Sequence, residues 1–271
     1  MIEGIGLHSG EKMKLIFLPA EENTGLVFTR KINDKEFSLP VHVDNVIDTS
    51  LAVTLGNEHF HVQTVEHLLF SLFVLGITDL IIEIQGGDEV PITDGSSIPF
   101  IEALDVCELH EFPQEVEPIV IRKPVMVTDG DRYLVGLPDP DFKISYSIDY
   151  PHPLLKNRSI EMVFDQEFFK QQVGRARTFG FLREVELLKS RGLAQGGSTA
   201  NAVVFTPDGI MNEMRFDQEP IFHKVLDLIG DLALVQRPIQ GHVLCSKGGH
   251  SLDVAVCKKL LRHEKPQREA A

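Results

Sequence analysis

Residues 223–235, HKVLDLIGDLALV, combine apolar residues at helical spacing with polar residues one turn apart. This pattern predicts a helix over 223–235. His223 and Asp227 stand at i and i+4 on it, so their side chains leave the same face, and such a pair can bind one metal ion. Because an i, i+4 His/Asp pair is more often a surface interaction or a satisfied core pair, the pair alone does not establish a metal site.

Strands and helices follow one another in two similar runs along the chain. The first run has predicted strands at 13–18, 25–30, 51–55 and 80–84, and predicted helices at 65–75 and 99–109. The second run has predicted strands at 118–127, 132–137, 142–150, 201–205 and 242–246, and predicted helices at 166–173, 183–191, 223–235 and 254–261. Each run passes from strands to helices. This order predicts an α+β fold of two similar domains, each a mostly antiparallel sheet with helices on one face.

A linker separates the two runs. The segment EFPQEVEP (111–118) lacks apolar periodicity and has a proline near each end. We therefore predict an N-terminal domain over residues 1–115 and a C-terminal domain over residues 116–271.

The composition is that of a globular protein and excludes several kinds of partner. The 271 residues are 43% hydrophobic and carry a formal net charge of -14, so diffuse attraction to nucleic acid or to an anionic membrane is not expected. The apolar stretch LLFSLFVLGI (68–77) is shorter than the roughly 20 residues of a membrane-spanning helix. Three widely spaced cysteines and the lack of a signal-peptide pattern predict a cytoplasmic protein, which we expect to be a monomer.

Further motifs carry residues suited to catalysis. Glu66 and His67 are adjacent in QTVEHLL, where one side chain can bind a metal ion and the other can act on its water. His250 follows two glycines in KGGHSLD, which permit close approach of a ligand, although a glycine turn with an exposed histidine gives the same pattern. Thr178 lies in GRARTFGF (174–181), which is also consistent with a simple helix cap beside basic residues.

Taken together, these motifs resemble a known enzyme family. The segments that carry the resemblance are GIGLHSGEK (4–12), TVEHLLFSL (64–72), EVPITDGSSIPF (89–100), GRARTFGFLREVELLKSRGLAQGGS (174–198), FHKVLDLIGDL (222–232) and KGGHSLD (247–253). In content and order they are similar to the UDP-3-O-(3-hydroxyacyl)-N-acetylglucosamine deacetylases, zinc enzymes of the committed step of lipid A synthesis in Gram-negative bacteria. The resemblance implies two domains packed helix layer to helix layer, with the active site between them.

The resemblance also implies a role for each matching residue. His67, His223 and Asp227 match the zinc ligands. Glu66 matches the general base, and His250 the general acid. Thr178 matches the group that stabilises the oxyanion, and Asp231 the carboxylate that orients the acid. The matches to substrate contacts are Phe179, Lys224 and Lys247, together with Val185 and Gly197 in an acyl-chain insert at about residues 179–205.

The implied reaction is hydrolysis of the N-acetyl group of a UDP-linked, 3-O-acylated glucosamine, with release of acetate. The implied cofactor is one Zn²⁺ ion, with Fe²⁺ as an alternative in vivo. Zinc lowers the pKa of bound water towards ~7 and polarises a carbonyl oxygen, which is the activation that amide hydrolysis needs.

Some positions depart from the family pattern, and two other functions are considered. The chain begins close to GIGLHSG, Phe222 stands where Arg is common, and Asp253 stands where Asn is common. One alternative is a catalytically silent nucleotide-sugar binding protein of the same fold, and the complete set of matching residues argues against it. The other is a zinc peptidase, which is disfavoured because no H-E-x-x-H is present and the Glu-His order is reversed.

Overall fold

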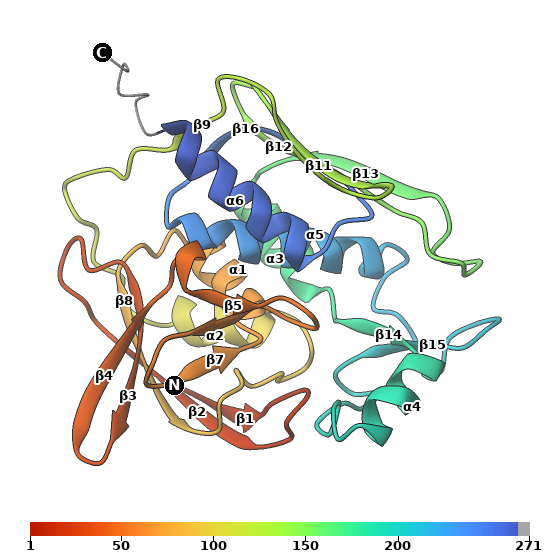
Figure 1. The fold of residues 1–271 in the computed structure, drawn as a ribbon, viewed down its shortest axis with the longest axis horizontal. Helices are drawn as coiled ribbons and strands as arrows, with labels where there is room; N and C mark the ends of the chain where they lie inside the picture. The colour runs from red at the N-terminus through yellow and green to blue at the C-terminus, as the bar shows by residue number, and fades with distance from the viewer. Residues whose placement is uncertain (265–271) are drawn as a thin grey trace.

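The computed structural model describes residues 1–264 and contains two main sheets with helices packed between them (Figure 1). The predicted C-terminal domain extends to residue 271, so its end, 265–271, lies outside the described residues.

The N-terminal sheet has the strand order β1-β2-β8-β3-β4. Its strands are β1 (Ile2–Ile5), β2 (Lys12–Leu18), β3 (Leu26–Ile32), β4 (Lys35–Pro40) and β8 (Leu80–Gly86). Strand β8 is antiparallel to β2 and parallel to β3. Alternate residues are buried, such as Met13 and Leu15 on β2 and Ile82 and Ile84 on β8, so one face of the sheet packs on the core.

The C-terminal sheet has the order β10-β11-β16-β12-β13, with β9 also paired to β16. Its strands are β9 (Ile119–Val120), β10 (Val125–Asp129), β11 (Arg132–Leu137), β12 (Phe142–Ile148), β13 (Arg158–Val163) and β16 (Ile239–Ser246). Strand β16 is antiparallel to β11 and parallel to β12.

The two sheets share one topology. In each, two hairpins form the sides, and the last strand of the run enters the centre between them. That last strand is antiparallel to the first hairpin and parallel to the second in both cases. The predicted α+β fold of two similar, mostly antiparallel units is therefore confirmed. The exact boundary at 115/116 stays a prediction.

The helices that line the space between the sheets include α1 and α5, one from each run. The α-helices of residues 1–264, including those outside this space, are α1 (Glu66–Leu75), α2 (Ile98–Asp105), α3 (Gln166–Gln171), α4 (Leu182–Ser190), α5 (Glu219–Leu232) and α6 (His250–Glu264). Helix α5 packs against α1 at Gly230, where a Cβ atom would overlap the backbone carbonyl of Glu66. Glycine at 230 therefore lets the first turn of α1 lie directly against α5.

Several helix limits differ from the sequence-based prediction. Helix α5 begins at Glu219 rather than His223, and its predicted last turn is the 3₁₀ segment η3 (Ala233–Val235). Helix α6 begins at His250 rather than 254. Because α6 starts earlier, His250 lies on a helix and not in a glycine turn before it.

Smaller elements complete the fold. They are η1 (Val43–Asn45), η2 (Val173–Arg175), the antiparallel strands β5 (Val46–Asp48), β6 (Thr54–Gly56) and β7 (His61–Gln63), and the parallel pair β14 (Phe179–Phe181) and β15 (Val203–Phe205). Strands β14 and β15 and helix α4 project from the layered body (Figure 1). Among residues 1–264, no helix combines the length and the apolar character needed to cross a membrane.

Candidate metal centre

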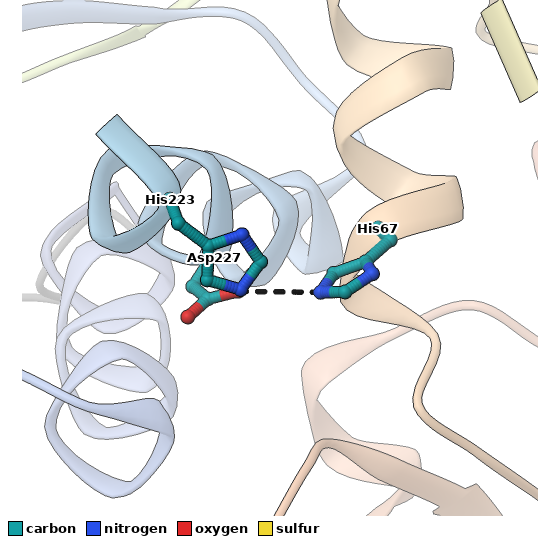
Figure 2. A group of neighbouring side chains, drawn as sticks. All are labelled: His67, His223 and Asp227. Carbon is teal, nitrogen blue, oxygen red and sulfur yellow. Dashed lines mark ion pairs between the residues drawn. The ribbon is translucent and has the colours of Figure 1, made fainter. Parts of the chain in front are cut away.

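Two helices bring the three predicted ligands together. His67 comes from the first turn of α1, whereas His223 and Asp227 lie one turn apart on α5 (Figure 2). One donor atom of each residue lies within 4.8 Å of the other two. Oδ1 of Asp227 is 3.6 Å from Nε2 of His67 and 3.3 Å from Nε2 of His223. All three side chains are buried, so the donors face one small volume that is shielded from bulk water.

His223 is held in the protonation state that a metal ligand needs. Its Nδ1–H donates a hydrogen bond of 3.0 Å to the carbonyl of Ala176, which leaves Nε2 unprotonated and directed at the cluster. Burial lowers the pKa of His223 to about 3. A neutral imidazole with its free nitrogen turned inward is suited to bind a metal ion.

Asp227 is ionised, and its two carboxylate oxygens face different partners. Burial alone raises the pKa of this carboxyl, but the neighbouring His223 and Lys224 outweigh that effect and hold the pKa well below its usual range. Nζ of Lys224 donates to Oδ2 at 2.6 Å, while Oδ1 faces the two imidazoles. Two imidazoles and one carboxylate are a donor set that fits Zn²⁺ with a position left for water.

Glu66 lies beside the cluster on the first residue of α1. The residue is 3% exposed, and Oε2 accepts a hydrogen bond of 3.1 Å from the backbone N–H of Val53. Burial raises the pKa of Glu66, although the neighbouring His250 and His67 oppose the change. A carboxylate with a raised pKa is a better proton acceptor than an exposed one.

His250 faces Glu66 across the site. Nε2 of His250 lies 3.9 Å from Oε1 of Glu66, and Nδ1 donates to Oδ2 of Asp231 at 2.7 Å. Burial alone lowers the pKa of His250, but the carboxylates of Asp231 and Glu66 overcome it and raise the pKa to about 10. The side chain is therefore an imidazolium at neutral pH.

Phe179, a predicted substrate contact at the start of the insert, lies beside the cluster. Its ring centroid is 6.4 Å from that of His223, and it also packs edge-on against Tyr150. Thr178 is half-buried, and its backbone joins two segments: its N–H donates to Gly95 and its carbonyl accepts from Val203. Thr178 is thus anchored just before β14, next to Phe179.

The other predicted contacts lie elsewhere. Lys247 pairs with two carboxylates, at 2.8 Å from Oδ2 of Asp131 and 3.4 Å from Oδ2 of Asp149. Val185 lies on α4 beside Gly180, and Gly197 lies near Leu7 and Ala194. Val185 and Gly197 both belong to the projecting insert, whereas Lys247 precedes α6.

Two departures from the family pattern have structural explanations. Phe222 is turned into an aromatic cluster, with ring centroids 5.3 Å from Phe216 and 6.2 Å from Phe168. It therefore serves packing and not the metal cluster. Asp253 is buried beside Asp231 and His250. This position was not expected from the sequence, because α6 was predicted to begin after Asp253.

The chain is similar to known proteins over nearly its whole length. A family profile described as LpxC, UDP-3-O-acyl N-acetylglycosamine deacetylase, matches residues 1–262. A protein of Leptospira biflexa named UDP-3-O-acyl-N-acetylglucosamine deacetylase is 47% identical over 262 residues, which are 96% of this chain and 86% of the relative. Proteins of the same name from Myxococcus xanthus and Wolinella succinogenes are 42% and 40% identical, over 96% and 97% of this chain and 83% and 88% of theirs. The chain belongs to the UDP-3-O-acyl N-acetylglycosamine deacetylase family.

Proposed function

We propose that this protein is a zinc-dependent amidase that removes the N-acetyl group from UDP-3-O-acyl-N-acetylglucosamine and releases acetate, the committed step of lipid A synthesis. The observation that carries the proposal is one buried cluster: three metal donors beside a carboxylate and an imidazolium that lie 3.9 Å apart. The family membership and the names of the relatives point to the same reaction.

His67, His223 and Asp227 are the proposed ligands of one Zn²⁺, with Fe²⁺ as a possible replacement in the cell. The neutral state of His223 and the ionised state of Asp227 support this assignment, because a metal ion binds those forms. When bound, the ion supplies Lewis acidity, which activates water and polarises the amide carbonyl.

Glu66 and His250 are the proposed proton-transfer groups, and they lie 3.9 Å apart. Glu66 takes a proton from the attacking water, for which its raised pKa is suited. His250 is charged at neutral pH and donates a proton to the departing nitrogen, since an amine does not leave as an anion. Asp231 orients His250 through the 2.7 Å hydrogen bond. Thr178 is the proposed donor to the oxyanion.

The proposed substrate contacts combine positive charge with apolar surface. Lys224 and Lys247 supply cations for a diphosphate on a protein whose net charge is -14, and the carboxylates now paired with Lys247 would share it with the ligand. Phe179 lies at the start of the insert that carries Val185 and Gly197. Burial of an acyl chain against the insert contributes about 0.8 kcal/mol per CH₂ group.

The decisive experiment measures acetate release and metal content on the same purified protein. We expect about one zinc per chain and release of acetate from the UDP-linked 3-O-acyl substrate. Binding of substrate without acetate release would instead support the catalytically silent alternative. Cleavage of a peptide with no action on the nucleotide sugar would support the peptidase.

A matched variant separates catalysis from metal binding. Glu66→Gln preserves the size of the side chain and an oxygen that accepts from the Val53 N–H, but it cannot take a proton from water. We expect it to keep its zinc and to lose roughly 10² to 10⁴ in kcat. Loss of zinc in this variant would contradict the assignment of Glu66 as a base and make it a ligand.

A further inference from the structure

Asp253 is a buried carboxyl group that the proposed reaction does not use. It lies on the first turn of α6, is 1% exposed, and neither of its oxygens has a hydrogen-bond partner within residues 1–264. The adjacent Asp231 is 0% exposed, and its Oδ1 also has no partner in this part of the chain. Two neighbouring carboxyl groups therefore leave three buried oxygen atoms without a donor.

The nearby cations are already engaged by other carboxylates. Nζ of Lys224 is bonded to Asp227 at 2.6 Å, and Nδ1 of His250 is bonded to Asp231 at 2.7 Å. An ionised carboxylate that is buried without a cation or donor is strongly unfavourable, and such a group takes up a proton instead. Burial and the neighbouring charge of Asp231 act in this direction, since both raise the pKa of Asp253 well above its usual value.

We infer that Asp253 is a neutral carboxylic acid that donates a hydrogen bond to Oδ1 of Asp231, and that it thereby positions Asp231 behind the general acid His250. One oxygen of Asp253 lies within 4.8 Å of one oxygen of Asp231 and of one ring nitrogen of His250, so the three groups form one close cluster. The proposed bond forms when the two carboxyl groups close this gap. The inference rests on the proposed function in one respect, the role of His250 as general acid. The hydrogen bond from protonated Asp253 to Asp231 does not depend on that role.

The consequence is that both oxygens of Asp231 are held. Oδ2 accepts from His250 and Oδ1 accepts from Asp253, so the direction of the imidazole is fixed by two bonds and not one. Asp253 is therefore a positioning residue, because it acts through Asp231 and does not touch the substrate.

Titratable groups on four elements face Asp253 and set its protonation. They are Lys224, Asp227 and Asp231 of α5, His250 and Cys257 of α6, Tyr146 of β12 and Cys245 of β16. Burial raises the pKa values of Tyr146, Cys245 and Cys257, so these three side chains are also uncharged at neutral pH. Within residues 1–264, the groups that face Asp253 therefore bring it no positive charge beyond Lys224 and His250.

The first test is the infrared spectrum of the zinc-loaded protein near neutral pH. We expect the difference spectrum between wild type and Asp253→Asn to contain the carbonyl stretch of one protonated carboxylic acid. The control is Asp139→Asn, because Asp139 is ion-paired with Lys143 and its pKa is lowered, so its loss removes only a carboxylate band. Absence of the protonated band in the Asp253 difference spectrum would overturn the inference.

The second test is the pH dependence of unfolding. A carboxylic acid whose pKa is raised on folding keeps its proton in the folded state at a pH where the unfolded chain has lost it. Such a group lowers the free energy of unfolding as the pH rises above about 4. Asp253→Asn removes this effect, and its unfolding free energy relative to wild type should therefore increase between pH 5 and pH 8. A difference that stays flat, or that decreases with pH, would show that Asp253 is ionised.

The third test is activity, with a conservative and a disruptive variant. Asn can donate to Asp231 without a titrating proton, so Asp253→Asn should stay within about threefold of wild type, whereas Asp253→Leu should lower kcat roughly 10-fold or more. Equal loss in both variants would contradict the positioning role. Metal titration gives a further check. If wild type bound a second metal ion and Asp253→Asn did not, Asp231, His250 and Asp253 would be metal ligands, and the inference would be overturned. If the protein had no deacetylase activity, the first two tests would still decide where the proton lies.

Discussion

The pair His250–Asp231 determines how the proposed reaction depends on pH. The pKa of His250 is raised from 6.5 to about 10, and after the opposing effect of burial the largest contribution comes from the charge of Asp231. Replacement of this carboxylate by a neutral amide removes the contribution. In Asp231→Asn the alkaline limb of the kcat–pH profile should therefore move to lower pH, with kcat at the optimum lowered roughly 10- to 100-fold.

The control for this prediction is Asp217→Asn. Asp217 is exposed and pairs only with Arg158 among the described residues, at 3.3 Å, so its replacement should leave the limb in place. An unchanged limb in Asp231→Asn would show that the group that titrates on the alkaline side is not His250.

The sequence alone pairs some of these residues and not others, and the difference lies in whether the two residues share one helix. His223 and Asp227 were found together because both lie on one predicted helix, where a spacing of four fixes their relation. The pair His250–Asp231 joins two different helices, so its hydrogen bond could only be implied by the family resemblance. The position of Asp253 depends on α6 beginning at His250, which the predicted start at 254 concealed.

The contact of α1 with α5 carries a prediction at the scale of the element. A methyl group at Gly230 would overlap the carbonyl of Glu66 and force the two helices apart. We expect Gly230→Ala to lower the free energy of unfolding by roughly 1–3 kcal/mol and to weaken zinc binding, because His67 moves with α1 while His223 and Asp227 stay on α5. Denaturant unfolding and a zinc titration measure the two effects.

A matched change is Gly209→Ala, since Gly209 has a φ that other residues adopt and meets only the far end of Thr206 at 3.7 Å. It should alter neither quantity. If Gly230→Ala kept both the stability and the zinc affinity of wild type, the close approach of the helices would not be what places the ligands.

The long elements were predictable, whereas the short ones depended on tertiary pairing. The central strand β8 and helix α1 agree with their predicted ranges within two residues. Buried residues alternate along most of β8, and α1 is an almost wholly buried apolar segment that ends at Gly76. The strands β4 and β13 were not predicted. Their sequences KEFSLP and RSIEMV carry charges and are almost entirely exposed or half-buried, and each is an edge strand defined by its partner in the sheet.

At the scale of the whole molecule, the proposed metal ion joins the two runs of the chain. His67 belongs to the first run, and His223 and Asp227 belong to the second, so the ion bridges them in the folded protein only. Chelation should lower the thermal midpoint by on the order of 10 °C, as follows for a ligand present at about 1,000 times its Kd. Differential scanning fluorimetry with and without chelator measures the shift.

The variant His67→Ala serves as the reference for chelation. It lacks the ligand from the first run, so its midpoint should already be low and should not respond to the chelator. An equal response of both proteins would mean that the chelator acts elsewhere than at this cluster.

The placement of β16 at the centre of its sheet also sets when the protein can become active during synthesis. Strands β11 and β12 cannot be joined until β16 has been made, and β16 ends at Ser246, just before the final described helix. A ribosome-bound chain stopped before residue 239 would thus carry His67, His223 and Asp227 but lack the strand that unites the second sheet beneath α5. Competence to hold the metal should therefore appear late and abruptly as the chain lengthens, and a product shortened before β16 should not retain zinc.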